Sequence, residues 1–488
     1  MRTCLLLLAA LLLPVCGIAT AADPYALDGD RFLFLDTFLL YSIEGAAVTV
    51  NPPRFDELVI IADRPWETGG ITSYGNAFYD HLAHEYRLYY VPVCWDVPPG
   101  FCLALATSTD GIAWEKPELG AVEWKGSKAN NIVIWGQREG TVIIDPNASA
   151  DHRYAFLSSE PSLKTRLFTS PDGIHFTMGD EQVSSHHSDS QISTFWDGDR
   201  GAYVHYPRVV HDGLRAIGMV TTGTMDEAWP EATPMVMSRD DRDIPGVDLY
   251  TNACQKYALA RKAYVGFPTP YYHYNEPSRA YLNEPTLAIG GKTNDGTIET
   301  QLAVSRDGVG WTRYRRPYIP VGKYDGLDVK IAMAIPGIFY EDDRLVQFFM
   351  GYTFTHGDTQ IRHGDGGREL GGVFRVEQRI DGFTSLDFDY EGGVVITQPL
   401  TFSGSRLVLN VNTSASGEAR VAILDAGGNE LEGYGLADAR FVNGDYLEKT
   451  AEWRDGASDV GPLAGKPVRL RFVCRGTKLH SFRFASGE

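Results

Sequence analysis

Short stretches of alternating apolar and polar residues run through almost the whole chain and are separated by turn-forming residues. Examples are residues 86–90, 101–106 and 153–157, which have Pro92, Gly100 and Asp151 within two residues of them. A period of two predicts β-strands with one buried face. Long runs with helical spacing are scarce, so the pattern predicts an all-β protein.

A motif of Ser or Thr, Asp and an aromatic residue interrupts this pattern five times, at 108–114, 170–176, 224–229, 305–311 and 379–385. The gaps between its Asp residues are 62, 54, 81 and 74 residues (172−110, 226−172, 307−226, 381−307), which suit one four-stranded sheet each. Asp-Gly after Ser makes a tight turn, because Asp accepts backbone N–H bonds and Gly takes φ > 0. One copy is an ordinary surface turn, but five predict a five-bladed β-propeller with the motif in each outer hairpin.

Counting back from each motif locates the strand expected to line the central channel. These inner strands are predicted at 74–80, 140–145, 189–197, 248–252 and 328–333. After Gly392 the motif stops, and alternation at 406–411, 418–424, 467–472 and 479–484 predicts a small β-sandwich. The predicted domains are therefore the propeller at 22–391 and the sandwich at 392–488.

The first 21 residues have the features of a secretory signal peptide. Arg2 supplies the positive start, residues 5–13 the apolar core, and residues 19–21 a small-residue cleavage site. Lipid attachment at Cys16 is an alternative, but Pro14 and Val15 fit that signal poorly. We therefore expect a secreted or periplasmic protein with no membrane span.

Charge and cysteine content narrow the class of partner. The formal net charge of −19 becomes −20 when the signal and its Arg2 are removed, which disfavours a nucleic-acid partner because phosphate binding needs a basic face.

Cys94 and Cys102 flank a turn-rich loop and suggest a loop-closing disulfide, whereas Cys254 and Cys474 are expected to be buried thiols. No Cys/His spacing indicates a zinc site, and no cofactor is predicted.

Residues at the starts of inner strands should converge on the channel mouth, and the types found there suit sugar chemistry. Glycoside cleavage needs one protonated and one ionised carboxyl group, while aromatic, Arg and His side chains hold the sugar. Acids near predicted openings also include Glu139, Asp325 and Asp328; Asp80, Asp145 and Asp197 are assigned to turns. The candidate catalytic residues are Asp189, Asp248 and Glu67. The candidate substrate-binding residues are Arg64, Trp66, His186, His187, Arg208, Tyr250, His273 and His356.

With these motifs the chain resembles the secreted five-bladed propeller glycosidases of glycoside hydrolase families 32 and 43. The resemblance rests on residues 32–40, 63–67, 108–132, 248–250, 305–308 and 479–484. It implies three acids at inner-strand starts, a glycan substrate and, in some propellers of this type, a channel Ca²⁺. The Asn-Asp-Pro, Arg-Asp-Pro and Glu-Cys motifs of those enzymes are absent here, so the catalytic residues are assigned by position.

Three functions remain open at this stage. A glycosidase requires carboxyl groups about 5 Å apart for retention or about 6.5 to 9.5 Å apart for inversion. A carbohydrate-binding propeller would retain glycan without releasing product, with the sandwich as a further binding module. A structural or interaction protein would have its channel filled by side chains. For each single acid the alternative role is that of a turn cap.

Overall fold

The computed structural model describes residues 23–94, 96–159, 164–184, 188, 190–274, 295–357 and 367–487. Within these ranges the chain forms β-strands joined by turns and a few single-turn 3-10 helices, as the alternating pattern predicted. No helix in the described part is long and apolar enough to cross a membrane. The predicted signal peptide lies outside the described residues.

Five groups of strands, which we call blades, follow one another along the chain between β5 and β31. The first two contain β6 (Ile71–Asp80), β7 (Glu85–Pro92), β8 (Cys102–Ser108) and β9 (Ile132–Trp135), then β10 (Val142–Ile144), β11 (Tyr154–Ser159), β12 (Thr165–Ser170) and β13 (Thr177–Ser184). The third contains β14 (Ser193–Asp197), β15 (Ala202–Tyr206) and β18 (Val220–Thr222), extended by β16 (Arg208–His211), β17 (Leu214–Gly218) and β19 (Met235–Met237). The fourth contains the four-stranded sheet of β21 (Gln255–Lys256), β22 (Tyr264–Gly266), β25 (Thr300–Ser305) and β26 (Trp311–Ile319), together with β20 (Asp248–Leu249), β23 (Pro270–His273) and β24 (Gly296–Ile298), which continue the sheet of β29 because β24 pairs with β29. The fifth contains β29 (Ile331–Glu341), β30 (Arg344–Tyr352), β31 (Gly371–Arg379) and β5 (Arg54–Ile61).

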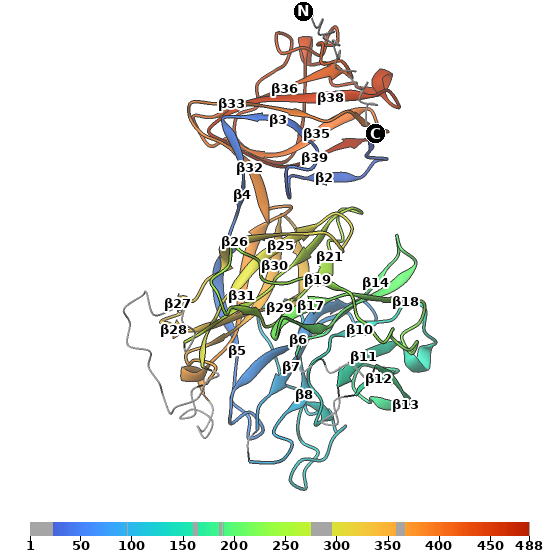
Figure 1. Ribbon diagram of the computed structural model, residues 1–488, viewed down its shortest axis with the longest axis vertical. Coiled ribbons are helices and arrows are strands. Elements are labelled where there is room, and N and C mark those ends of the chain that lie inside the picture. The colour runs from blue at the N-terminus through green and yellow to red at the C-terminus, as the bar shows by residue number, and fades with distance from the viewer. Residues whose placement is uncertain are drawn as a thin grey trace, which may run out of the picture.

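The inner strands of these blades, β6, β10, β14, β21 and β29, surround one cavity. Strand β6 contacts β10 and β29, β10 contacts β14, and β14 contacts β21. Strand β5, which precedes the first sheet in the chain, pairs antiparallel with β31 as the outer strand of the last sheet, and Figure 1 shows the two side by side. This closure removes open sheet edges. The fold is thus the predicted propeller. Four of the five predicted inner strands overlap the observed ones, whereas the prediction at 248–252 covers β20 and misses the inner strand β21 at Gln255–Lys256.

The repeated motif forms the same turn in three of its five copies, always between the third and fourth strands of a sheet. In the first, Ser108 Oγ accepts the N–H of Gly111 (2.9 Å), and Asp110 Oδ1 accepts those of Ile112 and Ala113 (2.9 and 2.8 Å). These N–H groups lower the pKa of the Asp110 carboxyl. The copies at Ser170 and Ser305 make the same bonds. The motif is therefore architectural, as predicted.

Each of the latter two turns also joins neighbouring blades. The carbonyl of Gly173 accepts the Tyr89 hydroxyl of the first blade (2.8 Å), and the carbonyl of Gly308 accepts the Tyr206 hydroxyl of the third (2.7 Å). The copy at 224–229 differs, because the Gly223 N–H donates to the Glu227 carboxylate instead. The motif thus fixes contacts between blades as well as its own hairpin.

Replacement of Gly308 by Ala is expected to lower the free energy of unfolding by about 2 to 4 kcal/mol. The residue has φ +69, and an added Cβ would lie 2.7 Å from the Tyr206 hydroxyl. Gly201→Ala is the matched control, because Gly201 has φ +64 but nothing within 4 Å; we expect a loss of about 1 kcal/mol there. Equal losses in urea unfolding would contradict the proposed Tyr206 contact.

A second repeated contact links the inner strands to the next blade. Asp80 closes the turn after β6 by accepting the N–H groups of Leu82 and Ala83, and it also accepts the hydroxyl of Tyr154 in the second blade (2.7 Å). Asp145 accepts the Tyr203 hydroxyl and Asp197 the Tyr264 hydroxyl in the same way. These three acids are the turn residues that the sequence indicated, and their contacts hold the ring together.

The free energy of unfolding is expected to decrease as the pH falls from 6.5 to 4, partly because of His205. Its buried ring lies between the hydroxyls of Thr194 (3.1 Å) and Thr222 (2.9 Å), and burial lowers its pKa from 6.5 to about 3. The unfolded chain binds this proton near pH 6.5 and the folded chain does not, so stability is complete above pH 6.5 and decreases as the pH falls. The expected loss from this residue is about 3 kcal/mol at pH 4.

Urea unfolding of wild type and His205→Asn at pH 7 and pH 4 tests this expectation. The variant should show a shallower pH dependence, whereas His211→Asn, at an exposed histidine, should match wild type. A His205→Asn variant with the wild-type pH dependence would rule out this origin of acid sensitivity.

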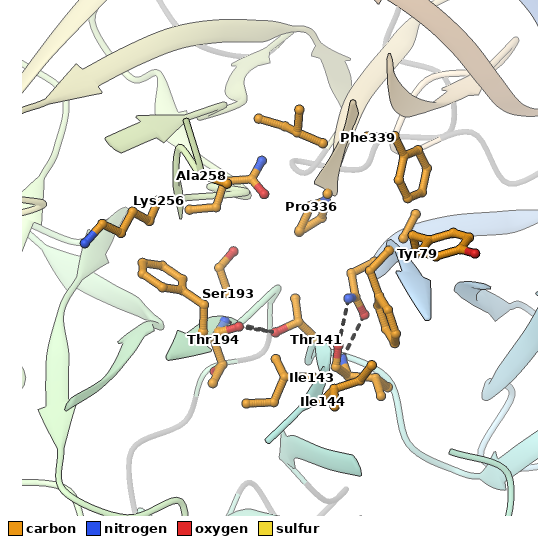
Figure 2. A pocket seen from close by; sticks show the side chains of 18 of the residues that line it. Tyr79, Thr141, Ile143, Ile144, Ser193, Thr194, Lys256, Ala258, Pro336 and Phe339 are labelled. Atoms are coloured by element: carbon orange, nitrogen blue, oxygen red, sulfur yellow. Dashed lines mark hydrogen bonds between the residues drawn. The ribbon is translucent and has the colours of Figure 1, made fainter. Parts of the chain in front are cut away.

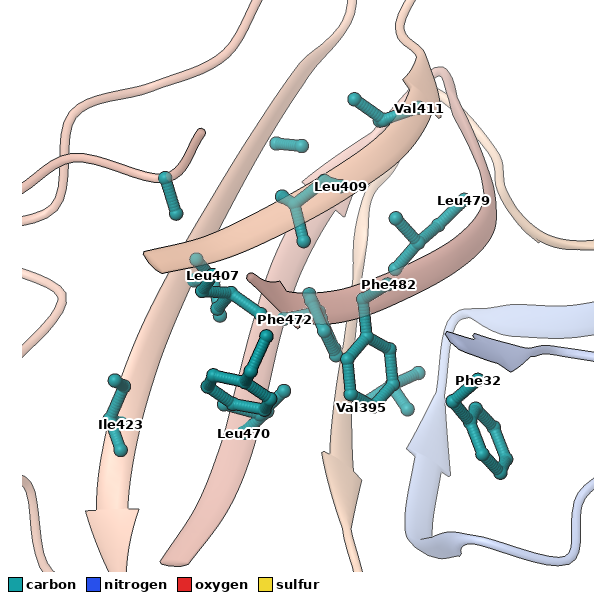
Figure 3. Close-up of a cluster of buried hydrophobic side chains, with 14 of the residues drawn as sticks. Phe32, Val395, Leu407, Leu409, Val411, Ile423, Leu470, Phe472, Leu479 and Phe482 are labelled. Atoms are coloured by element: carbon teal, nitrogen blue, oxygen red, sulfur yellow. The ribbon is translucent and has the colours of Figure 1, made fainter. Parts of the chain in front are cut away.

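Two further sheets pack over a common core at the other end of the molecule (Figure 1). One contains β1 (Tyr25–Ala26), β3 (Leu40–Glu44), β33 (Gly393–Thr397), β34 (Leu400–Thr401), β36 (Glu418–Asp425) and β38 (Val468–Arg475). The other contains β2 (Arg31–Leu33), β4 (Ala46–Val50), β32 (Thr384–Phe388), β35 (Arg406–Asn412), β37 (Asp445–Thr450) and β39 (Thr477–Ala485). Figure 3 shows the core between them, where the ring of Phe482 lies 5.4 Å from that of Phe32 and 6.1 Å from that of Phe472.

The boundary between the propeller and the two-sheet body does not lie at the single predicted position near residue 391. Strands β1 to β4 and β32 belong to the two-sheet body, although they lie within the range assigned to the propeller. Strand β2 pairs with β39, and β4 pairs with β32. The reason is long-range pairing: the apolar residues around Phe32 fill the core of the second body, which their local sequence does not reveal.

The fifth motif copy lies where the two bodies meet and does not form the motif turn. Asp381 is fully buried, and its carboxylate accepts bonds from Arg31 (2.7 Å), Tyr257 (2.8 Å), Ser481 (2.5 Å) and Asn410 (3.3 Å). Tyr257 belongs to the fourth blade, and the other three belong to the two-sheet body. The outer-hairpin prediction is therefore wrong for this copy, which joins the two bodies.

The predicted disulfide between Cys94 and Cys102 is not formed. Both residues are buried free thiols. Cys102 packs with Trp66 and Ile132 in a small apolar cluster, and burial raises its pKa well above the usual value. The residue thus acts as a small apolar side chain.

Candidate functional site

The two ends of the propeller channel differ in chemistry. Toward the ends of the inner strands lies a cavity of about 830 Å³, lined by residues of β6, β10, β14, β21 and β29. Figure 2 shows its wall, which includes Tyr79, Ile143, Pro336 and Phe339 together with Lys256. Among the described residues that line it there is no carboxylate. Acid–base chemistry on a sugar therefore has to be sought at the strand starts.

At the strand starts, Asp248 forms the centre of a charged group. It begins β20 and is 3% exposed. Its Oδ2 accepts a bond from Arg215 of β17 (2.7 Å) and lies 3.5 Å from His273 Nε2 at the end of β23. Burial opposes the charge of Arg215, but the Asp248 carboxylate outweighs this effect and raises the guanidinium pKa. Asp248 Oδ1 is buried and has no hydrogen-bond partner in the described structure, so it can accept a bond from a ligand.

Aromatic side chains from three blades surround this group. The Tyr250 hydroxyl lies 2.9 Å from the Tyr74 hydroxyl of the first blade and 3.0 Å from His356 Nε2 of the fifth. The Arg215 guanidinium lies over the Tyr250 ring at 5.2 Å, and Tyr271 contacts the rings of His273 (3.8 Å) and His356 (4.8 Å). Together these residues form what we call the Asp248 cluster: Tyr74, Arg215, Asp248, Tyr250, Tyr271, His273 and His356.

Asp295 fixes the segment that carries His356. Its Oδ1 accepts the N–H of Gly357 (2.8 Å), and the His356 N–H donates to the carbonyl of Gly296 (3.1 Å). The Asp295 side chain is buried, and its Oδ2 has no hydrogen-bond partner in the described structure. A second buried carboxylate thus lies next to the segment that brings His356 to Tyr250.

Asp189, His186 and His187 lie outside the described residues, but their neighbours touch the cluster. Ser190 Oγ donates to the carbonyl of Tyr250 (2.5 Å). Ser188 Oγ accepts the N–H of Arg208 at the start of β16 (3.0 Å). The chain on either side of Asp189 is therefore anchored at the cluster and beside Arg208.

Glu67, Trp66 and Arg64 lie in the loop before β6 and make contacts within that loop and with the first blade. The fully buried Glu67 accepts bonds from the N–H groups of Asp63 (2.8 Å) and Arg64 (3.0 Å), from Lys116 (2.6 Å) and from the Tyr90 hydroxyl (2.7 Å). Both carboxylate oxygens are thus occupied. None of these partners belongs to the Asp248 cluster.

The remaining residues of this loop have equally local contacts. Trp66 is buried and donates to Asn131 (3.0 Å), whereas Arg64 is partly exposed beside Asp63 (3.6 Å). The structure thus does not bring Arg64, Trp66 and Glu67 together with Tyr250, His273 and His356.

The other acids considered near strand starts have separate surroundings. Glu139 pairs with Arg138 (2.8 Å), whose guanidinium lies 5.8 Å from the Tyr74 ring and so borders the cluster. Asp325 and Asp328 are exposed in the hairpin of β27 (Gly322–Tyr324) and β28 (Leu327–Val329), not at an inner-strand start. In the described part of the chain, no three His, Cys, Asp or Glu residues are grouped to hold a metal ion.

Sequence reasoning missed Arg215, Tyr74 and Asp295. Arg215 lies in β17, away from the predicted inner strands, and nothing in its local sequence distinguishes it from the other arginines. Tyr74 begins a predicted inner strand, but the sequence around it indicates no site role. Asp295 precedes Gly296 and follows a long segment, residues 275–294, that contains no copy of the repeated motif. Its place in the fold could therefore not be predicted by counting back from a motif.

The sequence matches no protein-family model and no curated protein. The solved structures that are similar to the chain at low identity include the following three. An N-acetylgalactosamine deacetylase from F. plautii is 13% identical over 72% of this chain and 96% of that one, with a TM-score of 0.40. A family 43 arabinoxylan arabinofuranohydrolase from Bacillus subtilis is 10% identical over 85% and 97%, with a TM-score of 0.36. An exo-inulinase from Aspergillus awamori is 12% identical over 90% and 99%, with a TM-score of 0.38. At such scores the similarities do not assign a role to any residue.

Proposed function

We propose that this protein is a secreted glycoside hydrolase that cleaves a polysaccharide or oligosaccharide at the Asp248 cluster. The observation that carries the proposal is the buried Asp248 carboxylate, which has one oxygen bonded to Arg215 and one open only in the sense that it has no hydrogen-bond partner in the described structure, and which is surrounded by tyrosine and histidine rings. Aromatic rings offer stacking surfaces for sugar rings, and the open oxygen can accept a sugar hydroxyl. Export is proposed from the signal-like residues 1–21 alone.

In this proposal Asp248 and Asp189 form the carboxyl pair. One of them protonates the glycosidic oxygen as the bond to the anomeric carbon breaks, and the other acts as base toward water or as nucleophile. Arg215 and His273 orient the Asp248 carboxylate by binding Oδ2. Glu67 serves as a positioning residue for the loop before β6, since both of its oxygens are already bonded.

A carbohydrate-binding propeller is the second candidate. The observation that favours it is the strong engagement of Asp248 Oδ2 by Arg215 (2.7 Å), which suits a fixed hydrogen-bond acceptor as well as a catalytic group. Both candidates use the same residues to hold sugar, and they differ only in whether the glycosidic bond is cleaved.

Incubation of the protein with a panel of plant and algal polysaccharides and of aryl glycosides separates the two functions. The proposal predicts new reducing ends or aryl alcohol with at least one substrate. Retention of a glycan in affinity electrophoresis with no product after prolonged incubation would reject hydrolysis and support the binding function.

A further inference from the structure

The outer face of the sheet containing β36 and β38 carries a row of arginines. Along these strands Val421, Ile423, Leu470 and Phe472 point into the core, so the alternating residues point away from it. Those outward residues include Arg420, Arg469 and Arg471. Figure 1 shows β36, β38, β33 and β3 in one layer of the two-sheet body.

The register brings the three guanidinium groups close together. Arg420 pairs with Val473, and Ala422 pairs with Arg471, so Arg420 and Arg471 are diagonal neighbours on one face. Arg469 follows two residues away on the same strand. Diagonal and same-face neighbours in a sheet are about 7 Å apart, a spacing at which several arginines can bind one polymer.

Two of these arginines have no carboxylate partner in the part of the chain that is described. Arg420 makes no ion pair, and its Nε is buried without a hydrogen-bond partner. Arg469 donates to the carbonyl oxygens of Ala426 and Thr397 (both 3.1 Å). Arg471 is paired with Glu430 (2.9 Å). This unbalanced positive charge stands out in a chain with a formal net charge of −19.

An exposed aromatic ring lies beside the arginines. The Arg469 guanidinium lies 4.4 Å from the centre of the Tyr41 ring, and Tyr41 is 63% exposed. The guanidinium fixes the ring on one side, because a cation over a ring face is attracted to it. The other side of the ring remains open to solvent and can stack on a sugar.

The other acids near this face do not cancel its charge. Glu418, at the far end of β36, lies 4.0 Å from Arg475. Asp425 accepts bonds from Asn429. Both acids therefore have their own partners, and the centre of the face keeps the charges of Arg420 and Arg469.

We propose that this arginine face, formed by Tyr41, Arg420, Arg469 and Arg471, binds an acidic polysaccharide. Guanidinium groups bind carboxylate and sulfate oxygens with charge-assisted hydrogen bonds, and Tyr41 adds stacking on a sugar ring. The partner chemistry is an anionic group carried on a glycan, as a uronate or a sulfate ester. The site is separate from the Asp248 cluster and does not depend on hydrolysis there.

Affinity electrophoresis in native gels tests the proposal, with polygalacturonate, dextran sulfate or neutral dextran in the gel. Wild type should be retarded by an anionic polymer and not by dextran, and the dissociation constant should rise about tenfold or more in Arg420→Gln/Arg469→Gln. Retardation by only one anionic polymer would identify the group that is bound. Arg483→Gln, on β39 of the other sheet, is the matched control and should behave like wild type.

Three results would overturn the proposal: no retardation of wild type by either anionic polymer, equal retardation by dextran, or wild-type retardation of the double variant. Thermal unfolding of each variant checks that the fold is intact. Asp248→Asn should keep full retardation, so that a failure of the hydrolase proposal and a failure of the arginine face are seen separately.

Discussion

Replacement of Asp248 by Asn is expected to lower kcat/KM for the best glycan substrate by about 10³-fold, within the range that acid–base groups contribute. The amide keeps the size of the side chain but cannot act as base or nucleophile. It also presents an N–H₂ group where the carboxylate now accepts a bond from Arg215 and lies 3.5 Å from His273 Nε2. Initial rates of reducing-sugar release by wild type and variant measure the effect.

Glu67→Gln is the control for this substitution, because Glu67 is also a buried acid near a strand start but has both oxygens bonded inside the protein. It should lower the midpoint of thermal unfolding, since it weakens the bond to the Lys116 ammonium, and change kcat by less than about threefold. If Asp248→Asn stays within threefold of wild type while Glu67→Gln abolishes activity, the assignment of Asp248 is wrong.

Replacement of Asp381 by Ala is expected to lower the free energy of unfolding by about 3 to 5 kcal/mol, as for other buried ion pairs that lose one partner. The change leaves Arg31, Tyr257, Ser481 and Asn410 without their shared acceptor. Because these partners come from the propeller and from the two-sheet body, the junction between the bodies should loosen. Urea unfolding followed by tryptophan fluorescence provides the measurement.

The matched control is Asp343→Ala, which removes an exposed acid 3.2 Å from Arg344. Exposed ion pairs contribute little, so a change of about 0.5 kcal/mol or less is expected. An Asp381→Ala variant that is no less stable than Asp343→Ala would show that the buried acid does not hold the bodies together.

The repeat allowed the propeller to be predicted because its turn is a local structure. Ser108, Asp110 and Gly111 bond to backbone groups within five residues of one another, so the sequence alone determines the hairpin. Counting back from the first two such turns placed β6 and β10 correctly, whereas the third turn placed the inner strand at 248–252, a few residues before β21. These strand positions indicated where the inner strands begin. The sequence therefore also indicated Asp248, Tyr250, His273 and His356 as candidate site residues.

Contacts between distant parts of the chain could not be predicted in this way. Strand β2 pairs with β39 more than 400 residues later, and no local pattern encodes that pairing. Arg215 reaches Asp248 from another blade, so its role depends on how the blades pack. Glu67 occupies a position suited to catalysis in the sequence, but its bonds to Lys116 and Tyr90 appear only in the folded structure.

The structure of Asp248→Asn bound to a glycan that the wild-type protein cleaves or retains tests the central claim most directly. The variant should hold the glycan without turning it over. We predict a sugar ring within hydrogen-bond distance of residue 248 and in contact with the Tyr250 ring. A glycan bound instead in the cavity lined by Tyr79 and Phe339 at the other end of the channel, with the Asp248 cluster empty, would contradict the claim.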